Sequence, residues 1–585
     1  MDDLSFIINQ DQNLFFFEIE KKINECQKKL SKDSKDIPTI SQLAKYSSQI
    51  KNNDLSIYFA SEATRLKPKS LKLKLDLFHY LLINGNVEEV CKKIKKLFLS
   101  KNLIEGSKDS SLLLKLINLF GHYCHDHVST IDFVEKVYTK FPDDNNVIMT
   151  YAFVNKMFLA NIEKSRKLIA KLIKRNFINQ LVISNWLDLY QKDNPQKTLL
   201  LCDILKKKYP NLIDLINHYN FNCYATIGDK EKANFYLDKN KDSLHYVTNK
   251  IRIDALYIKT LDLNIYLNKY QMLVKHQKSM NLLKLSGILS STCLIIAKKY
   301  EFLKDFKRKN YFLEKSHYYF FKHNYLSLQN NLNIGSEMPK NLYKKSKKAE
   351  DLINKRNFNM KLQPIFILGL PRSGSSILEK TIFENFNIKP CGESQIIQKY
   401  IINILSKKQN FDFLNLYKNE FRDIDKFEGF TDKTLNNFSY INLIIKSYPN
   451  AKFINCMRNP KENVLSIFNV IFENQPWAHS LENILDYANQ YFILMDKFKK
   501  LYPKNILTIK HSDLVLNKEK VLENIFDFLK MKKNTIKNPL TKSFFGTTES
   551  QWQIRQKVSN KFLNRYSKDY YILDKYLKKY KWLNQ

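Results

Sequence analysis

Apolar and polar positions follow two different patterns along this chain. Up to about residue 345 the sequence reads as one helix after another, with few glycines. Beyond this helical part, short apolar runs alternate with amphipathic helices. Candidate strands are Pro364–Leu368, Lys452–Met457 and Asn505–Lys510, and candidate helices are Ser375–Asn385, Lys461–Phe472 and Lys518–Leu529. Strands separated by helices predict a parallel α/β sheet that binds ligands at the carboxyl ends of its strands.

Three similar phrases end helices in the first part: Arg65-Leu66-Lys67-Pro68, Lys140-Phe141-Pro142-Asp143 and Lys208-Tyr209-Pro210-Asn211. Their prolines lie 74 and 68 residues apart, which is two units of 37 and two of 34, and a weaker turn falls near Asn176. A helix pair about 34 residues long resembles the tetratricopeptide repeat, although the full Trp-Leu-Gly-Tyr pattern is missing. We therefore expect an α-solenoid of tetratricopeptide-like helix pairs that binds a protein partner or substrate. The alternative is a helical scaffold without a ligand of its own.

The length of 585 residues is too great for one core, and the polar, lysine-rich stretch 336–361 is the natural junction. We expect a repeat domain over residues 1–345 and a P-loop-like α/β domain over residues 346–585. The 96 basic and 58 acidic residues give a net charge of +38, which would suit an acidic partner or a nucleic acid. Because the lysines are dispersed and no nucleic-acid motif accompanies them, solvated helix faces are the better interpretation, and no specific nucleic acid is predicted.

Targeting and metal-binding signals are weak. The acidic N-terminus lacks the features of a secretory signal, and the apolar run over 285–297 is too short to span a membrane. The eight cysteines form no CxxC pair, which favours a reducing, cytoplasmic location. On a helix, at most two of His122, Cys124, His125 and His127 share a face, so no metal is expected.

The most informative stretch is residues 364–376, where an apolar run breaks at Gly369 into a polar loop and then a helical pattern. Backbone N–H groups of such a loop and helix converge on one point, which binds phosphate or sulfate. The spacing from Gly369 to Gly374 is that of a Walker A loop, but Ser375 stands where the lysine should be. The loop therefore predicts a nucleotide held through its 5′-phosphate, without chemistry at a γ-phosphate.

A second polar segment follows the strand Lys452–Met457. This strand ends at Arg458, Pro460 opens a helix, and Ser466 lies about two turns into it. No Asp or Glu directly follows the strand, so a Walker B magnesium ligand is not evident. This absence, together with the missing loop lysine, argues against a nucleoside triphosphatase or kinase.

These motifs resemble those of sulfotransferases that use 3′-phosphoadenosine 5′-phosphosulfate (PAPS). The loop over 371–376 is similar to the family's 5′-phosphosulfate motif, and Arg458 with Ser466 to its 3′-phosphate motif. Cys391-Gly392-Glu393 and Asp432-Lys433-Thr434 resemble the segments that carry the catalytic glutamate and lysine of tyrosylprotein sulfotransferases. Helical repeats before such a domain are similar to those of bacterial tetratricopeptide-repeat sulfotransferases.

A late segment completes the resemblance, which covers roughly residues 360–570. Residues 548–556 resemble the motif that brings a serine, here Ser550, to the transferring group. Leu435 and Lys557 stand where the family commonly has proline, and the stretch 511–514 reads His-Ser-Asp-Leu in place of Tyr-Glu-Asp-Leu. The histidine base of small-molecule sulfotransferases has no clear counterpart, so a carboxylate base is expected.

The resemblance implies a role for each residue. Glu393 takes the proton of the acceptor hydroxyl, and Arg372, Lys433 and Ser550 stabilise the charge of the transition state. The residues implied to bind PAPS are Arg372, Ser373, Gly374, Ser375, Ser376, Arg458, Ser466 and Arg555. The acceptor is a protein tyrosine, a glycan or another hydroxyl compound, which the sequence does not decide.

Each role has a structural alternative. Arg372 and Lys433 could be ordinary surface residues, Arg458 could form a salt bridge at the start of its helix, and Ser466 could face solvent. Glu393 could be a carboxylate in the first turn of a helix, stabilised by the helix dipole. At the level of function, the alternatives are an inactive repeat scaffold with a relic nucleotide domain, a kinase or nucleoside triphosphatase, and a nucleic-acid binder.

Overall fold

The fold is taken from a computed structural model. It describes residues 18–50, 52–84, 86–98, 100–123, 127–159, 161–191, 194–240, 246–253, 255–275, 282–325, 328, 333–353, 362–407, 412–421, 423–531 and 563–584. The chain forms two compact units. The first comprises residues 1–151, 271–287 and 322–330, and the second comprises residues 152–270, 288–321 and 331–585. The predicted domain boundary at residue 345 stays a prediction and falls within the second unit.

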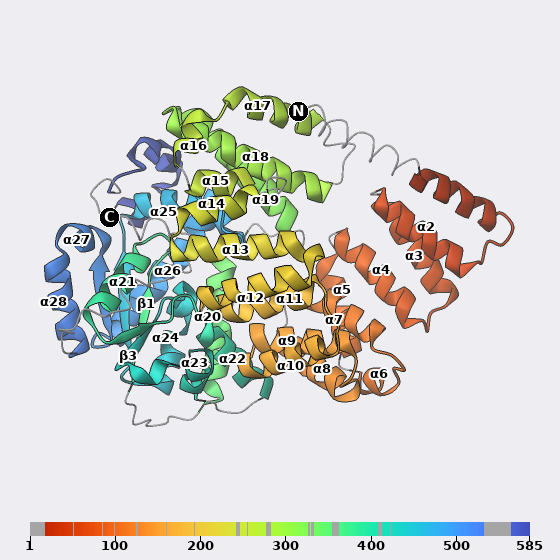
Figure 1. The fold of residues 1–585 in the computed structure, drawn as a ribbon, viewed down its shortest axis with the longest axis horizontal. Helices are drawn as coiled ribbons and strands as arrows, with labels where there is room; N and C mark the ends of the chain where they lie inside the picture. The colour runs from red at the N-terminus through yellow and green to blue at the C-terminus, as the bar shows by residue number, and fades with distance from the viewer. Residues whose placement is uncertain are drawn as a thin grey trace. The chain divides into compact units, whose positions relative to one another are not determined.

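The part before the sheet is helical, as the sequence predicts. Its α-helices are α2 (Ile37–Gln49), α3 (Asn53–Leu66), α4 (Leu71–Ile83), α5 (Val87–Phe98), α6 (Lys101–Glu105), α7 (Ser111–Tyr123), α8 (His127–Lys140), α9 (Asn145–Met157), α10 (Ile162–Lys174), α11 (Gln180–Gln191), α12 (Pro195–Lys208), α13 (Ile213–Ile227), α14 (Lys230–Asp238), α15 (Tyr246–Ile253), α16 (Ala255–Thr260), α17 (Leu263–Lys275), α18 (Leu282–Phe302), α19 (Phe306–Asn324) and α20 (Ile334–Asp351). Consecutive helices pack as neighbours, as α11 to α14 do in the second unit (Figure 1).

The proline phrases mark helix ends. Helix α3 ends at Leu66, α8 at Lys140 and α12 at Lys208, each followed by its proline two residues later. Proline there prevents the helix from continuing, because it lacks an N–H and clashes with the preceding turn. The weaker predicted turn is real as well: α10 ends at Lys174, and Asn176 adopts a left-handed φ of 57°.

The sheet has five parallel strands in the order β2-β3-β1-β4-β5. These are β1 (Gln363–Leu368), β2 (Ile388–Pro390), β3 (Gly429–Asp432), β4 (Lys452–Met457) and β5 (Ile506–Lys510). The three predicted strands correspond to β1, β4 and β5. The sequence analysis missed β2 and β3, because three or four residues containing Pro, Gly or Asp do not form an apolar run.

The sheet is accompanied by α21 (Ser375–Asn385), α22 (Ile396–Lys407), α23 (Phe413–Glu420), α24 (Ile441–Ser447), α25 (Pro460–Phe468), α26 (Leu481–Leu501), α27 (His511–Leu516) and α28 (Lys518–Leu529). Short 3₁₀ segments are η1 (Pro210–Leu212), η4 (Ile424–Lys426), η5 (Leu435–Tyr440), η6 (Pro476–His479), η9 (Ser567–Tyr576) and η10 (Lys581–Asn584). Helices α21 and α28 have the predicted bounds.

Helix α25 ends four residues earlier than predicted. Asn469 follows its last turn, and both the backbone N–H and the side-chain amide of Asn469 donate to the carbonyl of Leu465. These bonds satisfy an end carbonyl, so the helix stops there although the next residues are apolar.

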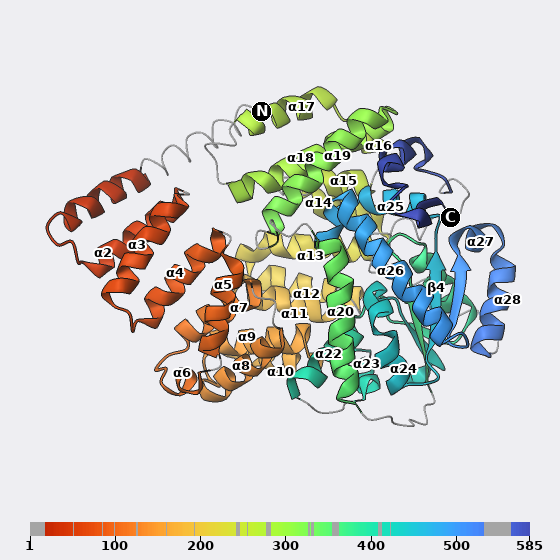
Figure 2. The ribbon, with the colours of Figure 1, turned by 180° about the vertical axis from the view of Figure 1, so that it is seen from behind.

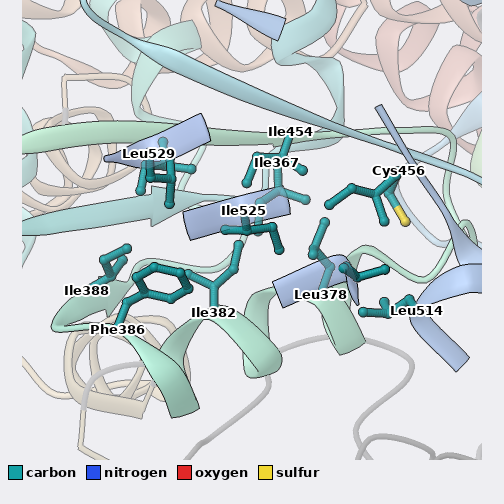
Figure 3. Close-up of a cluster of buried hydrophobic side chains, with 13 residues drawn as sticks. Ile367, Leu378, Ile382, Phe386, Ile388, Ile454, Cys456, Leu514, Ile525 and Leu529 are labelled. Atoms are coloured by element: carbon teal, nitrogen blue, oxygen red, sulfur yellow. The ribbon is translucent and has the colours of Figure 1, made fainter. Parts of the chain in front are cut away.

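Both faces of the sheet are buried, which explains why its strands read as continuous apolar runs. On one face, Leu378, Ile382 and Phe386 of α21 point toward the strands, and Ile525 and Leu529 of α28 belong to the same cluster (Figure 3). On the other face Phe366 of β1 packs against Phe453 of β4 and Phe413 of α23. Helices α20 and α26 run side by side next to this layer (Figure 2).

Candidate active site

Polar residues gather at one edge of the sheet, because all five strands are parallel and their carboxyl ends meet there. Strand β1 lies between β3 and β4 in the sheet. After β1 the chain continues to β2 and β3 on one side of it, and then crosses to β4 and β5 on the other side. The strand order therefore reverses beside β1. Ligands of open α/β sheets bind at such a point. The residues that follow the strands are the loop 369–374 after β1, Glu393 after β2, Lys433 after β3, Arg458 after β4 and His511 after β5.

The loop after β1 has an unusual backbone. Arg372 has a φ of +67°, a region that is costly for a bulky side chain, and Gly369 and Gly374 have φ values of +151° and +99°. A Cβ at Gly374 would lie 2.4 Å from the ring of His511, so only glycine fits. Left-handed residues of this kind cost about 1–3 kcal/mol and concentrate at functional sites.

The loop leads directly into α21. The N-cap residue of this helix is Gly374, which has no side chain to accept from the first-turn N–H groups, and these groups carry partial positive charge. The Ser373 hydroxyl is buried and has no hydrogen-bond partner in the part of the chain that is described. Loop amides and first-turn N–H groups at a sheet edge favour an anion.

Arg372 of the predicted 5′-phosphosulfate motif lies beside Arg458 and Ser466 of the predicted 3′-phosphate motif. The Arg372 Nε donates to the Ser466 Oγ at 3.5 Å, and the Arg458 Nη1 donates to the Arg372 carbonyl at 3.3 Å. Ser466 is 1% exposed, so the interpretation that it faces solvent is wrong. The amide of Asn463 fixes the same loop by donating to the Pro371 carbonyl at 2.7 Å.

Arg458 also forms the salt bridge at the start of its helix that the sequence allowed as an alternative to a ligand-binding role. Its Nη2 lies 3.1 Å from Glu462 Oε2, four residues further along α25. The other oxygen of Glu462 accepts hydrogen bonds from the Tyr566 backbone N–H and the Tyr570 hydroxyl, at 3.0 and 3.1 Å. Burial lowers the pKa of Arg458, and the Glu462 carboxylate opposes this effect. The salt bridge fixes the guanidinium at the carboxyl end of β4.

Glu393 and Lys433 form an ion pair, with Glu393 Oε1 2.8 Å from Lys433 Nζ. The Glu393 side chain is 47% exposed, whereas that of Lys433 is 2% exposed. Glu393 precedes α22, which begins at Ile396, so it is not a first-turn carboxylate, and Lys433 is not a surface lysine. Burial lowers the pKa of Lys433, but the carboxylates of Glu393 and Glu379 outweigh it and bring the pKa above its usual value.

Two buried carboxylates support this pair. Glu379 of α21 accepts hydrogen bonds from Gly392 N–H at 3.1 Å and from Thr431 Oγ1 at 3.0 Å. Asp432 accepts from Ser394 Oγ and from Thr434 N–H, each at 2.7 Å, and from the hydroxyl of Tyr417. Burial raises the pKa of Glu379 and of Asp432, and the hydrogen bonds each accepts oppose the rise.

His511 closes the edge beside the loop. Its ring is 6% exposed and packs against Gly374. Burial, reinforced by the nearby charge of Arg458, lowers the pKa of His511 to about 4, so the ring is neutral at pH 7. A neutral imidazole adds no charge near the Arg458 guanidinium.

The sequence motifs account for part of this arrangement. The predicted cofactor residues Ser373, Gly374, Ser375 and Ser376 lie in the loop and first turn of α21. Ser550 and Arg555 lie outside the described residues, as do the side chains over 122–127. Sequence reasoning missed the functional candidates Glu379, Glu462 and Asn463, and noted His511 only as a departure from a family motif. The position of His511 directly after a predicted strand was the available signal.

No group of three or more His, Cys, Asp or Glu side chains within the described ranges is arranged to hold a metal ion. Within these same ranges no helix is long and apolar enough to cross a membrane.

The fold and the candidate site define a class: a parallel α/β domain with a glycine-containing loop at the switch point of its sheet, preceded by tetratricopeptide-like helices. Residues 409–534 match the model of the Sulfotransferase family, which confirms the predicted resemblance of the C-terminal part. The matched range includes Lys433, Arg458 and Ser466.

Similar individual proteins were also found. An uncharacterized protein of Aquifex aeolicus is 25% identical over 195 residues, which is 29% of this chain and 26% of the relative. The match thus spans about a quarter of that relative's length.

Two solved structures show weak similarity. The sulfotransferase STF1 of Mycobacterium tuberculosis is 10% identical with a TM-score of 0.23, covering 46% of this chain and 88% of its own. The structure of Naa15/Naa10 bound to HypK-THB has a matching chain that is 11% identical with a TM-score of 0.23, covering 89% of this chain and 100% of its own. Scores of this size do not establish a shared fold.

Proposed function

We propose that this protein transfers a sulfuryl group from PAPS to a hydroxyl group of an acceptor. The observation that carries the proposal is the arrangement of one exposed carboxylate and three cations along a single sheet edge: Glu393 paired with Lys433, and Arg372 adjoining Arg458. Such an arrangement suits transfer of an anionic group to an oxygen nucleophile. The family match over residues 409–534 supports the same reaction class.

The described residues fit a nucleotide with two anionic ends. The loop N–H groups, the start of α21 and Arg372 suit the 5′-phosphosulfate, whereas Arg458 and Ser466 suit the 3′-phosphate. PAPS supplies the sulfuryl group and leaves as adenosine 3′,5′-bisphosphate. Recognition of the 3′-phosphate by an arginine would distinguish this nucleotide from ATP.

Glu393 is the proposed general base. Its exposed carboxylate is accessible to an acceptor, and removal of the hydroxyl proton by a positioned base contributes about 10²–10⁴-fold to the rate. Lys433, held beside it, neutralises charge on the oxygen that leaves the sulfur, and Arg372 shares this role. Ser550 and Arg555 remain proposed contributors from the segment that the structure does not describe.

The acceptor is proposed to be a hydroxyl compound such as a protein tyrosine or a glycan. The tetratricopeptide-like helices would bind a protein partner or the acceptor itself, and the proposed location is the cytoplasm. No resident metal is part of the proposal, because fixed cations supply the positive charge.

The first test is calorimetric binding of adenosine 3′,5′-bisphosphate, 5′-AMP and ATP. We expect the bisphosphate to bind most tightly, and Arg458→Lys and Ser466→Ala to weaken it roughly tenfold, in keeping with lost hydrogen bonds to a charged group. Binding of 5′-AMP should not change. Arg458→Lys is preferred to alanine because it leaves a cation beside the buried Glu462.

Ser336→Ala, at a partly exposed serine of α20 whose hydroxyl donates to the Asn333 carbonyl at 3.2 Å, is the matched control and should bind like the wild type. Equal affinity for ATP and the bisphosphate, or binding of neither, would contradict the proposal. A second arm measures transfer of labelled sulfate from PAPS to tyrosine peptides, glycans and small phenols. Tight bisphosphate binding without any transfer would favour an inactive scaffold.

A further inference from the structure

Glu379 is a buried carboxylate to which neither the sequence motifs nor the reaction scheme gives a role. It lies on α21, the helix that follows the anion loop, and is 3% exposed. One of its oxygens, Oε1, accepts two hydrogen bonds, from the Gly392 N–H at 3.1 Å and from the Thr431 hydroxyl at 3.0 Å. A carboxylate in such a place is costly unless it is compensated.

The two donors lie next to the Glu393–Lys433 pair in sequence. Gly392 directly precedes Glu393, and its carbonyl accepts the Lys433 backbone N–H at 2.8 Å. Thr431 lies two residues before Lys433 on β3. Glu379 thereby ties α21 to both segments that carry the proposed base and its cation.

Charge adds a second link. Lys433 pairs directly with Glu393 and is also attracted by the Glu379 carboxylate. The attraction is mutual, since Lys433 favours the ionised form of Glu379 against the effect of burial. Asp432 also acts on both groups, but Tyr417, Ser394 and Thr434 already donate to its carboxylate.

We propose that Glu379 is a positioning residue for the Glu393–Lys433 pair: it holds the Gly392 backbone and the Thr431 side chain and, together with Glu393, balances the charge of the buried Lys433. This inference rests on the proposed function. A buried ammonium group is retained only with compensating negative charge, and Glu379 supplies part of that charge. Helix α21 thereby has two proposed roles: it binds the anion at its start and holds the Glu393–Lys433 pair from its second turn.

The test separates charge from hydrogen bonding. Glu379→Gln keeps an acceptor for Gly392 and Thr431 but removes the charge, whereas Thr431→Val removes one hydrogen bond and keeps the charge. Glu384→Gln, on the solvent side of the same helix, is the matched control.

The first readout needs no substrate. Acetylation of Lys433 at pH 9 is followed by peptide mapping and normalised to the exposed Lys344. Loss of the Glu379 charge should lower the pKa of Lys433, which leaves more of its amine unprotonated at pH 9 and raises its acetylation rate several-fold. Thr431→Val and Glu384→Gln should keep the wild-type rate. An unchanged rate in Glu379→Gln, or an equal rise in Thr431→Val, would overturn the proposal.

The second readout is the pH profile of sulfate transfer. In Glu379→Gln the alkaline limb of kcat, where Lys433 loses its proton, should move to lower pH, and the plateau should fall several-fold, because Lys433 has lost part of its compensating charge. The KM for PAPS should stay near that of the wild type. If the wild type transfers no sulfate, the proposed function fails, whereas the acetylation result still decides whether Glu379 controls Lys433.

Discussion

At the scale of single residues, the site is organised by charges that are buried beside their partners. Arg458 lies between the Glu462 carboxylate and the Arg372 carbonyl, and Lys433 lies against Glu393. Buried charges of this kind are expensive to desolvate, so each is retained only with a partner of opposite sign. The arrangement keeps the cations fixed where an anionic ligand would meet them.

The burial of His511 predicts that the stability of the protein depends on pH in a testable way. The folded protein keeps its imidazole neutral down to about pH 4, whereas an unfolded chain protonates histidine below about pH 6.5. The contribution of His511 to stability is therefore complete above pH 6.5 and is lost as the pH falls toward 4. Between pH 7 and pH 4, the wild type should lose about 3 kcal/mol more stability than His511→Gln.

Urea unfolding at pH 7, 5.5 and 4, followed by circular dichroism, measures this difference. His218→Gln, at an exposed position of α13, should show the same dependence of unfolding free energy on pH as the wild type. Parallel pH dependences for the wild type and His511→Gln would show that the His511 ring is protonated as readily in the folded as in the unfolded chain.

At the scale of elements, the segment η9 near the C-terminus joins parts of the second unit that lie far apart in sequence. Asp569 pairs with Lys309 of α19, both nearly fully buried, and also accepts from the Asn310 amide at 2.9 Å. Tyr570 of this segment and Tyr566, directly before it, both donate to Glu462 of α25. Helix α19 is also fixed to α25 directly, since the His317 Nε2 lies 2.7 Å from the Phe468 carbonyl.

We expect Lys309→Met to destabilise the protein by about 3–5 kcal/mol, because it leaves the Asp569 carboxylate buried without its cation. The double variant Lys309→Met, Asp569→Leu should recover most of this loss, since apolar side chains of similar volume can replace a buried pair. Thermal melting of both variants and of Lys575→Met, at an exposed pair, measures the effect. Equal melting temperatures for the single variant and the wild type would contradict the expectation.

At the scale of the whole molecule, the net charge of +38 comes from lysines and arginines that are dispersed along the chain rather than concentrated in a nucleic-acid motif. The site itself relies on fixed arginine and lysine side chains. The physical consequence is that an anionic ligand can be held without a bridging metal ion.

Metal removal tests this point. Adenosine 3′,5′-bisphosphate at 100 times its Kd should stabilise the protein by about 2.7 kcal/mol. An excess of EDTA should leave both this stabilisation and sulfate transfer unchanged. A loss that added magnesium restores would instead favour a metal-dependent phosphotransferase.

The sequence by itself determined the helical first part, the strands β1, β4 and β5, the anion loop, and the motif residues that carry the proposed chemistry. These follow from local causes: proline stops helices, apolar runs form buried strands, and glycines permit the tight turn at 369–374. The residues Arg372, Glu393, Lys433, Arg458 and Ser466 could all be named from motifs of this kind.

Only the tertiary structure decided what surrounds them. Strand β3 is too short to be recognised alone, yet it sits between β1 and β2 and brings Lys433 to Glu393. Glu379 and Glu462 look like ordinary helix carboxylates in sequence, and only packing reveals that each is buried against residues distant along the chain. Two charged groups interact when they are close in space, and a local sequence pattern does not show which residues the fold brings together.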